Sequence, residues 1–319
     1  MTGPLVAEVV PGESGRSVTA RLTLDAGVEV ITFRALGSGP PLGANEDAMV
    51  TMALLPAMRM GRRLQVQGEI SPTLLGRTAE IEAYFHGWDP NYQVVDVEAQ
   101  RRRTAVEPAP PGSLTASFFT GGVDSLFTVL AGEQEVDELV YVHGFDVPLG
   151  NTTLRKTVSE SIRRTAHELG KPLVEVETDL RSFSDGVLSW GVYHGAALAT
   201  VALLLAHRYQ RVLIPSTRSG DVSPAGSDPR LAPLWGTERL TMAQDGVEVT
   251  RVDKVARIAG SEVAMRRLRV CWENRDGTYN CGRCEKCRRT MVNLAVAGAL
   301  GRCATLPSRL DLRMLWRAF

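Results

Sequence analysis

Residues 117–125, with the sequence SFFTGGVDS, form the first stretch whose residue types and spacing could do chemistry. An apolar run ends there in two glycines, Gly121 and Gly122, and a helix-compatible segment follows. Backbone N–H groups beyond such a pair can converge on an anion, and the start of a helix adds unpaired N–H donors. The hydroxyls of Thr120 and Ser125 could contact phosphate oxygens. The stretch therefore predicts a phosphate site at a strand-to-helix turn.

Asp124 adds a carboxylate to the same turn, and carboxylate and phosphate oxygens are the ligands that Mg²⁺ prefers. The stretch lacks the Walker pattern G-x-x-x-x-G-K-[ST]. Its adjacent glycines also lack the G-x-G-x-x-G spacing, so neither of these nucleotide-binding motifs applies. The alternative interpretation is a plain strand-to-helix turn in which Asp124 or Ser125 is the N-cap.

Four cysteines form the second stretch that could do chemistry, in the spacing C-x9-C-x2-C-x2-C. They are Cys271, Cys281, Cys284 and Cys287. Thiolates at this density favour tetrahedral Zn²⁺, whose four sulfur ligands close the coordination shell and leave no position for catalysis. An iron–sulfur cluster is the competing prediction, because four thiolates would also hold one. Cys303 stands apart, and we expect it to be a small buried side chain.

Residues 120–125 resemble the SGGxDS signature of the PP-loop, or N-type, ATP pyrophosphatases, with Thr120 in place of the first serine. This family splits ATP into AMP and pyrophosphate, usually by adenylating a carbonyl oxygen of its substrate. The resemblance implies ATP and Mg²⁺ as cofactors and a fold like that of the adenine nucleotide alpha-hydrolases. The residues it implies for nucleotide binding are Ser117, Thr120, Gly121, Gly122, Val123, Asp124, Ser125, His143, Thr217 and Arg251.

The order of the motifs is similar to that of the 7-cyano-7-deazaguanine synthases, a family of the queuosine pathway. A glycine turn, a lysine-bearing helix at 251–258 and a four-cysteine knuckle at 271–287 follow one another, and the resemblance covers about 114–297. It implies that Lys254, with Arg251, holds the α-phosphate or the leaving pyrophosphate, where a cation suits the developing charge. The catalytic residues that it implies are Asp124, Ser125 and Lys254. The alternative for Lys254 is a solvated helix residue.

Three departures limit this resemblance: Thr120, the N-terminal third of the chain and the tract 217–238. We therefore do not transfer the deazaguanine substrate. The expected function is ATP-dependent adenylation of a small-molecule carboxylate or amide oxygen with release of pyrophosphate. Ammonia or another nitrogen nucleophile would then attack, as in an AMP-forming ligase. The alternatives are ATP-dependent sulfur transfer to a nucleobase or other carbonyl, and a non-catalytic nucleotide-binding module.

The tract 217–238 is rich in Ser, Pro and Gly and exceeds the length of an ordinary loop, which predicts a lid. Its candidate substrate contacts are Arg218, Asp228 and Trp235. His194 precedes an apolar helix, and we expect it to be a helix-start or core histidine.

Alternating strands and helices over 113–319 predict the domain that must position these residues, an α/β domain with a doubly wound parallel sheet. In such sheets the ligand lies beyond the carboxyl ends of the strands, where the glycine turn, His143 and Thr217 fall. The expected strands cover 114–119, 139–142, 173–176 and 211–214. The expected helices cover 124–131, 153–169 and 195–209. The four-cysteine zinc knuckle completes this domain near its C-terminal end.

Residues 1–112 predict a separate β-rich N-terminal domain that ends in a Pro-rich linker. A hairpin is expected over 18–33, with its turn at 25–27, and 49–58 could be helix or strand. Further strands are expected at 64–68, 79–85 and 94–97.

Polar residues of this domain are assigned no chemistry. We expect the triplet Asn45-Glu46-Asp47 to be a solvated turn and the arginines at 101–103 to be solvated linker charge. We expect Trp88 to pack at the rim of the domain.

Composition places the chain of 319 residues among ordinary soluble proteins, with 44% hydrophobic and 23% charged residues. Lysine plus arginine balances aspartate plus glutamate at 36 each, so a tRNA partner is less expected than a small-molecule substrate. Neither a signal-peptide pattern nor an apolar run of membrane-spanning length is present, so we expect a cytoplasmic protein without a membrane partner. A homodimer is an open possibility.

Overall fold

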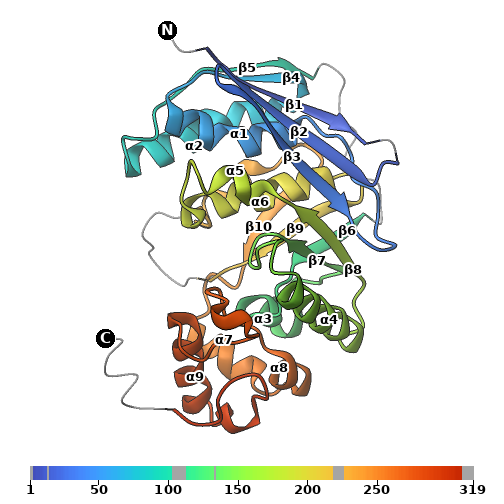
Figure 1. Cartoon of the computed structure of the whole chain (residues 1–319), viewed down its shortest axis with the longest axis vertical. Helices are drawn as coiled ribbons and strands as arrows, with labels where there is room; N and C mark the ends of the chain where they lie inside the picture. Colours follow the sequence, from blue (N-terminus) through green and yellow to red (C-terminus); the bar gives the residue numbers. More distant parts are fainter. Residues whose placement is uncertain (1–2, 13, 103–112, 133, 218–225, 311–319) are drawn as a thin grey trace. The chain divides into compact units, whose positions relative to one another are not determined.

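The computed structural model describes residues 3–12, 14–102, 113–132, 134–217 and 226–310. The proline-dense segment of the predicted linker, 106–112, and Arg218 lie outside the described residues. The fold is α/β, with a mostly parallel ten-stranded sheet (Figure 1). The strands are β1 (Leu5–Pro11), β2 (Ser17–Leu24), β3 (Gly27–Ala35), β4 (Leu64–Ile70), β5 (Val97–Arg101), β6 (Leu114–Phe118), β7 (Glu138–His143), β8 (Leu173–Thr178), β9 (Tyr209–Pro215) and β10 (Thr241–Asp245). They are hydrogen-bonded in the order β10-β9-β6-β7-β8-β3-β2-β1-β4-β5.

The chain divides into two compact units. The first unit comprises residues 1–116, 174–214 and 222–244, and the second comprises 117–173, 215–221 and 245–319. The helices of the first unit are α1 (Asp47–Met60), α2 (Pro72–Trp88), α5 (Leu180–Ser184) and α6 (Trp190–Leu204). Those of the second unit are α3 (Val123–Ala131), α4 (Thr152–Glu168), α7 (Arg251–Ile258), α8 (Glu262–Arg267) and α9 (Glu285–Val296). Among the described residues, no helix is both long enough and apolar enough to cross a membrane.

The predicted hairpin over 18–33 is confirmed in the first unit. Strands β2 and β3 pair antiparallel, with Val18 opposite Phe33 and Leu24 opposite Gly27 at the turn. Val18, Ala20 and other alternate side chains of β2 are fully buried, as expected for a strand with one face on the core. The expected strand at 64–68 is also confirmed, as β4.

The predicted strand at 79–85 is wrong, because these residues belong to α2. Ser71 caps this helix by accepting the N–H of Leu74, and Pro72 occupies its first turn, where a missing N–H costs nothing. The buried positions recur every three or four residues, which is a helical period. Residues 49–58 are likewise helical, within α1, so two helices accompany the strands of this region.

The strand expected at 94–97 lies later, since β5 begins at Val97 and ends at Arg101. Trp88 is partly exposed and stacks on Tyr92 with 6.2 Å between the ring centroids, which agrees with the expected rim position.

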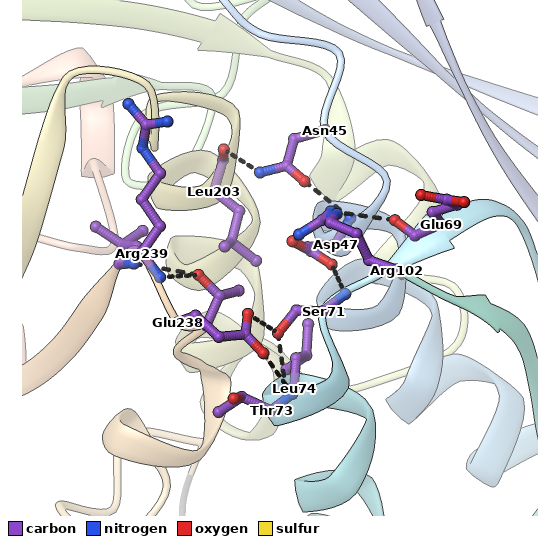
Figure 2. A network of polar contacts seen from close by, with 12 residues as sticks. Asn45, Asp47, Glu69, Ser71, Thr73, Leu74, Arg102, Leu203, Glu238 and Arg239 are labelled. Carbon is purple, nitrogen blue, oxygen red and sulfur yellow. Dashed lines mark hydrogen bonds and ion pairs between the residues drawn. The ribbon is translucent and has the colours of Figure 1, made fainter. Parts of the chain in front are cut away.

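The acidic triplet at 45–47 is not a solvated turn (Figure 2). Asp47 is 2% exposed, and its carboxylate accepts the N–H of Ser71 at 2.7 Å and an Arg102 Nη2 donor at 3.1 Å. Glu238 accepts the Ser71 hydroxyl at 2.6 Å and the N–H of Thr73 at 2.8 Å. The carboxylates of Asp47 and Glu238 thus satisfy donors at the start of α2, and Arg102 is an ion-pair partner rather than free linker charge.

The second unit supplies the elements that position the predicted site. Strand β7 is buried along its whole length, and the N–H of Phe119, just after β6, donates to the carbonyl of Val140 at 2.8 Å. Helix α3 begins directly after the glycine turn and packs against α7, which packs in turn against α9. Figure 1 shows α7 and α9 in orange and red.

Candidate functional site

The glycine turn lies between β6 and α3 and is closely packed. Gly121 has φ +71°, a left-handed conformation that side chains with a Cβ atom rarely adopt. A Cβ atom there would lie 3.1 Å from Cδ1 of Ile162, and one at Gly122 would lie 3.4 Å from the carbonyl oxygen of Arg269. Gly122 is the N-cap of α3, and no side chain caps the helix among the described residues. The first N–H groups of α3 are therefore available to donate hydrogen bonds to a bound anion.

The hydroxyl groups of the stretch have different positions. The hydroxyl of Ser125 donates to the carbonyl of Gly122 at 3.2 Å and accepts the N–H of Thr120 at 3.4 Å, so it braces the turn from within. Thr120 is exposed, whereas Ser117 is fully buried and donates to the carbonyl of Phe118 at 3.3 Å. Val123 is buried in the first turn of α3.

Asp124 in the first turn of α3 meets two cations from α7. Its Oδ2 atom accepts a hydrogen bond from Arg251 Nη1 at 2.7 Å, and its Oδ1 atom lies 3.9 Å from Lys254 Nζ. Arg251 and Lys254 are three residues apart, a spacing that places both on one face of the helix. The structure therefore brings three of the residues proposed from the sequence into one cluster.

Lys254 is buried rather than solvated, with 1% of its surface exposed. Its ammonium group donates to the carbonyl of Ser216, just after β9, at 2.6 Å, and lies 5.5 Å from the ring centroid of Phe127. Burial lowers the pKa of Lys254, and the carboxylate of Asp124 opposes this shift. A buried cation held by few partners gains from an added anion, because its own desolvation is already complete.

A third cation, Arg289, interacts electrostatically with Asp124 and Arg251 of this cluster, and sequence reasoning did not find it. Arg289 lies on α9, and its Nε lies 3.2 Å from Glu285 one turn earlier. Burial lowers the pKa of Arg289, the charge of Arg251 lowers it further, and the carboxylates of Glu285 and Asp124 oppose the shift. Arg289 lies two residues after Cys287 and belongs to no recognisable motif. Only the packing of α9 against α7 indicates that it is near the cluster.

Asp124 Oδ1 also offers a test of whether Mg²⁺ fits the turn. This buried oxygen accepts no hydrogen bond among the described residues, although Asp124 Oδ2 does. Mg²⁺ binds to carboxylate oxygens that lie next to phosphate, and Asp124 Oδ1 is such an oxygen beside N–H donors suited to phosphate. The residues present therefore fit a magnesium ion bound through Asp124.

His143 and Thr217 follow strands, as expected. His143 ends β7 in a buried position, with its ring edge-on to Tyr141 at 4.7 Å between centroids. Thr217 is exposed directly after Ser216, whose carbonyl holds Lys254. Ser216 thus links the end of β9 to the cation cluster, a contact that the sequence did not indicate.

The four cysteines converge at the start of α9. All four Sγ atoms lie within 4.8 Å of one another, and those of Cys271 and Cys284 are 4.0 Å apart. Four sulfurs at the usual zinc distance are separated by about 3.8 Å in a tetrahedron, so the arrangement fits such a site. Cys281 Sγ accepts the N–H of Cys284 at 3.2 Å, and Cys284 Sγ accepts that of Cys287 at 3.4 Å.

The surroundings of the sulfurs also suit a metal. Burial acts to raise the pKa of Cys281, but hydrogen bonds from the N–H groups of Arg283 and Cys284, together with those from the Cys271 and Cys284 side chains, bring the pKa down to about 7. Burial raises the pKa of Cys284 and Cys287, so without a cation these thiols stay protonated. Cys303 is not part of the group, and it is buried with its Sγ 3.6 Å from the Thr305 hydroxyl.

Two proposed substrate contacts belong to the first unit and have structural partners. Asp228 is buried, and both carboxylate oxygens accept hydrogen bonds from the Arg230 guanidinium at 2.8 Å, while the Tyr84 hydroxyl donates at 2.9 Å. The Arg230 hydrogen bond holds the pKa of Asp228 at about 2. Trp235 is buried in a short 3₁₀ helix.

Comparison with models of known protein families, with curated proteins and with solved structures finds no match for this chain.

Proposed function

We propose that the second unit is a PP-loop nucleotide site that binds ATP and transfers its adenylyl group to a small-molecule carboxylate or amide oxygen. The observation that carries this proposal is the cluster in which Arg251 and Lys254 approach Asp124 beside the uncapped start of α3. The likeness of residues 120–125 to the SGGxDS signature supports the nucleotide class.

The charges of the cluster suit a triphosphate. One carboxylate faces two cations, and the third, Arg289, adds further positive charge. A bound phosphate chain would complete the charge balance, with its oxygens on the N–H groups after Gly122. Mg²⁺ bound through Asp124 Oδ1 would supply further neutralisation of the phosphates. Lys254 and Arg251 would hold the α-phosphate or the leaving pyrophosphate, where negative charge grows in the transition state.

The reaction would proceed in two displacements. The substrate oxygen forms a bond to the α-phosphorus as the bond to the bridging oxygen of the pyrophosphate breaks, which gives an acyl or imidoyl adenylate. Ammonia or another nitrogen nucleophile then attacks the activated carbon, loses a proton and releases AMP. The described residues contribute by positioning and by charge neutralisation, so the scheme needs no dedicated general base.

For the four cysteines we propose a structural Zn²⁺ site. Four sulfur ligands would close the coordination shell, so the ion would hold the fold around α9 and take no part in the displacements.

Product analysis of ATP turnover tests the proposed function. Purified protein is incubated with ATP, Mg²⁺, ammonium and a panel of carboxylic acids, and nucleotides are separated by chromatography. AMP and pyrophosphate in equal amounts, dependent on one acid, are the expected products. ADP with phosphate would contradict the proposal, and ATP that binds without cleavage in any mixture would favour a binding module.

The same assay addresses sulfur transfer. Cys303, the one cysteine outside the metal group, is buried beside Thr305, which disfavours a persulfide carrier on this chain. Under the proposed ligase reaction, replacement of ammonium by sulfide should give no greater AMP yield. A yield that depends on sulfide instead would move the assignment to sulfur transfer.

A further inference from the structure

Residues 269–274, here called the strut, run from the glycine turn toward the loop after β7. The N–H of Arg269 donates to the carbonyl of Gly121 at 2.9 Å. The Arg269 carbonyl lies 3.4 Å from the position that a Cβ atom of Gly122 would take. One end of the strut is therefore packed directly on the turn proposed to bind phosphate.

Arg269 also presents a buried cationic side chain. It is 4% exposed, and its Nε atom has no hydrogen-bond partner among the described residues. A buried donor without an acceptor is costly in the absence of a ligand. The backbone of Arg269 lies on the glycine turn, so an anion bound at the turn would supply the missing acceptor.

Asn274, at the other end of the strut, joins two sides of the candidate site. Its Oδ1 accepts a hydrogen bond from Arg269 Nη2 at 2.7 Å, and its Nδ2 donates to the carbonyl of Asp146 at 2.8 Å. Asp146 belongs to the loop that follows His143 at the end of β7. Asn274 has φ +52°, a left-handed conformation that costs energy for a residue with a side chain. Its two hydrogen bonds offset this cost only while both partners are in place.

The candidate metal centre holds the middle of the strut. Cys271 lies between Arg269 and Asn274, and Asn280 Oδ1 accepts the N–H groups of Val270 at 2.9 Å and Cys271 at 3.1 Å. Asn280 immediately precedes Cys281, so a metal bound to Cys271 and Cys281 would fix both sides of this contact.

We propose that the strut couples the four-cysteine centre to the nucleotide site, with Asn274 as the positioning residue that orients Arg269 toward bound phosphate. Metal occupancy then sets nucleotide affinity, and by linkage bound nucleotide raises the affinity for the metal by the same factor. This inference rests on the proposed function, because it takes the glycine turn as the nucleotide site.

Two variants in one loop separate coupling from general stability. Asn274→Gly removes both hydrogen bonds, and glycine adopts the required φ without strain. Asp276→Gly is the matched control, since Asp276 also has a positive φ, of 56°, but its side chain is exposed and pairs only with Arg283 among the described residues.

The share of Zn²⁺ released to a competing chromogenic chelator at equilibrium is measured for the full chain, with and without ATP, and with Mg²⁺ in excess over ATP. This share gives the dissociation constant of Zn²⁺. Calorimetry gives the dissociation constant of ATP for the same samples. ATP should lower the dissociation constant of Zn²⁺ for the wild type and for Asp276→Gly by at least about fivefold, the lower range of allosteric coupling. Asn274→Gly should bind the same amount of zinc, lose most of this effect and bind ATP at least about fivefold more weakly.

Binding of ATP without any effect on metal release in the wild type would overturn the coupling and leave the proposed function standing. Equal ATP affinity in all three proteins would overturn the role of Asn274. Failure of the wild type to bind ATP would overturn the proposed function and the inference together. If Asn274→Gly fails to hold zinc, Asn274→Asp decides the role of Asn274. This variant keeps the oxygen that accepts from Arg269 and loses only the N–H that donates to the Asp146 carbonyl. Its ATP affinity should therefore lie between that of the wild type and that after a full loss of both hydrogen bonds.

Discussion

Asp124 and Arg251 form an ion pair of 2.7 Å between the first turn of α3 and the first turn of α7. The pair joins the glycine turn to the helix that carries Lys254, two segments more than 100 residues apart in the sequence. Both side chains are mostly shielded from solvent, so their charges act on each other and on a ligand with little screening.

Replacement of Asp124 by Asn should abolish AMP formation. The variant keeps the size of the side chain but leaves Arg251 and Lys254 without their carboxylate and removes the proposed magnesium ligand. We expect kcat/KM to fall by at least about 100-fold, with the circular dichroism spectrum unchanged. Asp253→Asn, at an exposed position of α7, is the control and should retain activity. Full activity of Asp124→Asn would remove Asp124 from the mechanism.

Replacement of Lys254 by Met should separate the charge of this residue from its packing. Methionine fills a similar volume, but it cannot neutralise a phosphate, so kcat/KM should fall by about 100-fold to 1000-fold while the protein remains folded. Arg257→Met is matched, because Arg257 is also on α7 and also lies 5.5 Å from the Phe127 ring centroid, but it is exposed. Equal losses of kcat/KM in the two variants would show that activity depends on the contact with the Phe127 ring and not on the charge of Lys254.

The pH profile should show an alkaline limb that belongs to Lys254. Activity should fall as the pH rises and Lys254 loses its proton. Because burial lowers the pKa of Lys254, this fall should begin before the pH reaches about 10.4, the ordinary lysine value. Arg stays protonated over the whole accessible range, so Lys254→Arg should keep part of the activity and lose this limb. The measurement is kcat/KM against pH for both proteins. An alkaline limb that persists in Lys254→Arg would assign it to another group.

The motifs at 120–125 and 271–287 could be predicted from the sequence because each is local. Two adjacent glycines after an apolar run permit a tight turn, and four cysteines in a short span can reach one metal ion, whatever surrounds them. The strands β6 and β7 and the helix α4 were predicted nearly in place for the same reason. Lys254 could be nominated through the family resemblance, but its burial could not.

Arg269, Asn274 and Arg289 could not be predicted, because their roles depend on groups distant in sequence. These groups are Gly121 for Arg269, Asp146 for Asn274, and the charges of Asp124 and Arg251 for Arg289. Arginines and asparagines are common on surfaces, and nothing in their spacing distinguishes these three. The error at 79–85 has a different cause. Its residues alternate between apolar and polar and fit a strand as well as a helix, and the cap at Ser71-Pro72 decides for the helix.

Loss of one sulfur ligand should cost both metal and stability. Cys284→Ser keeps an oxygen that can cap α9, as Cys284 Sγ does by accepting the N–H of Cys287, so its effect isolates the metal bond. We expect elemental analysis to find little bound zinc. The melting temperature should fall by about 10 °C, which corresponds to a loss of about 3 kcal/mol. Cys303→Ser should retain full zinc content. A zinc content unchanged in Cys284→Ser would contradict the proposed ligand set.

The ion pair of Asp228 with Arg230 should give the first unit an acid-dependent stability. The folded-state pKa of Asp228 is about 2, below the value of about 3.9 in an unfolded chain, so the unfolded state binds the proton more readily. The stabilisation is therefore present above about pH 4 and is lost as the pH falls toward 2. Because the Arg230 side chain is 70% exposed, the contribution is discounted to about 1 kcal/mol. Urea unfolding of the wild type and of Asp228→Asn should differ by this amount at pH 7, and the difference should shrink between pH 4 and pH 2. A difference that stays constant across that range would show that Asp228 acts through packing and its Tyr84 hydrogen bond, not through its charge.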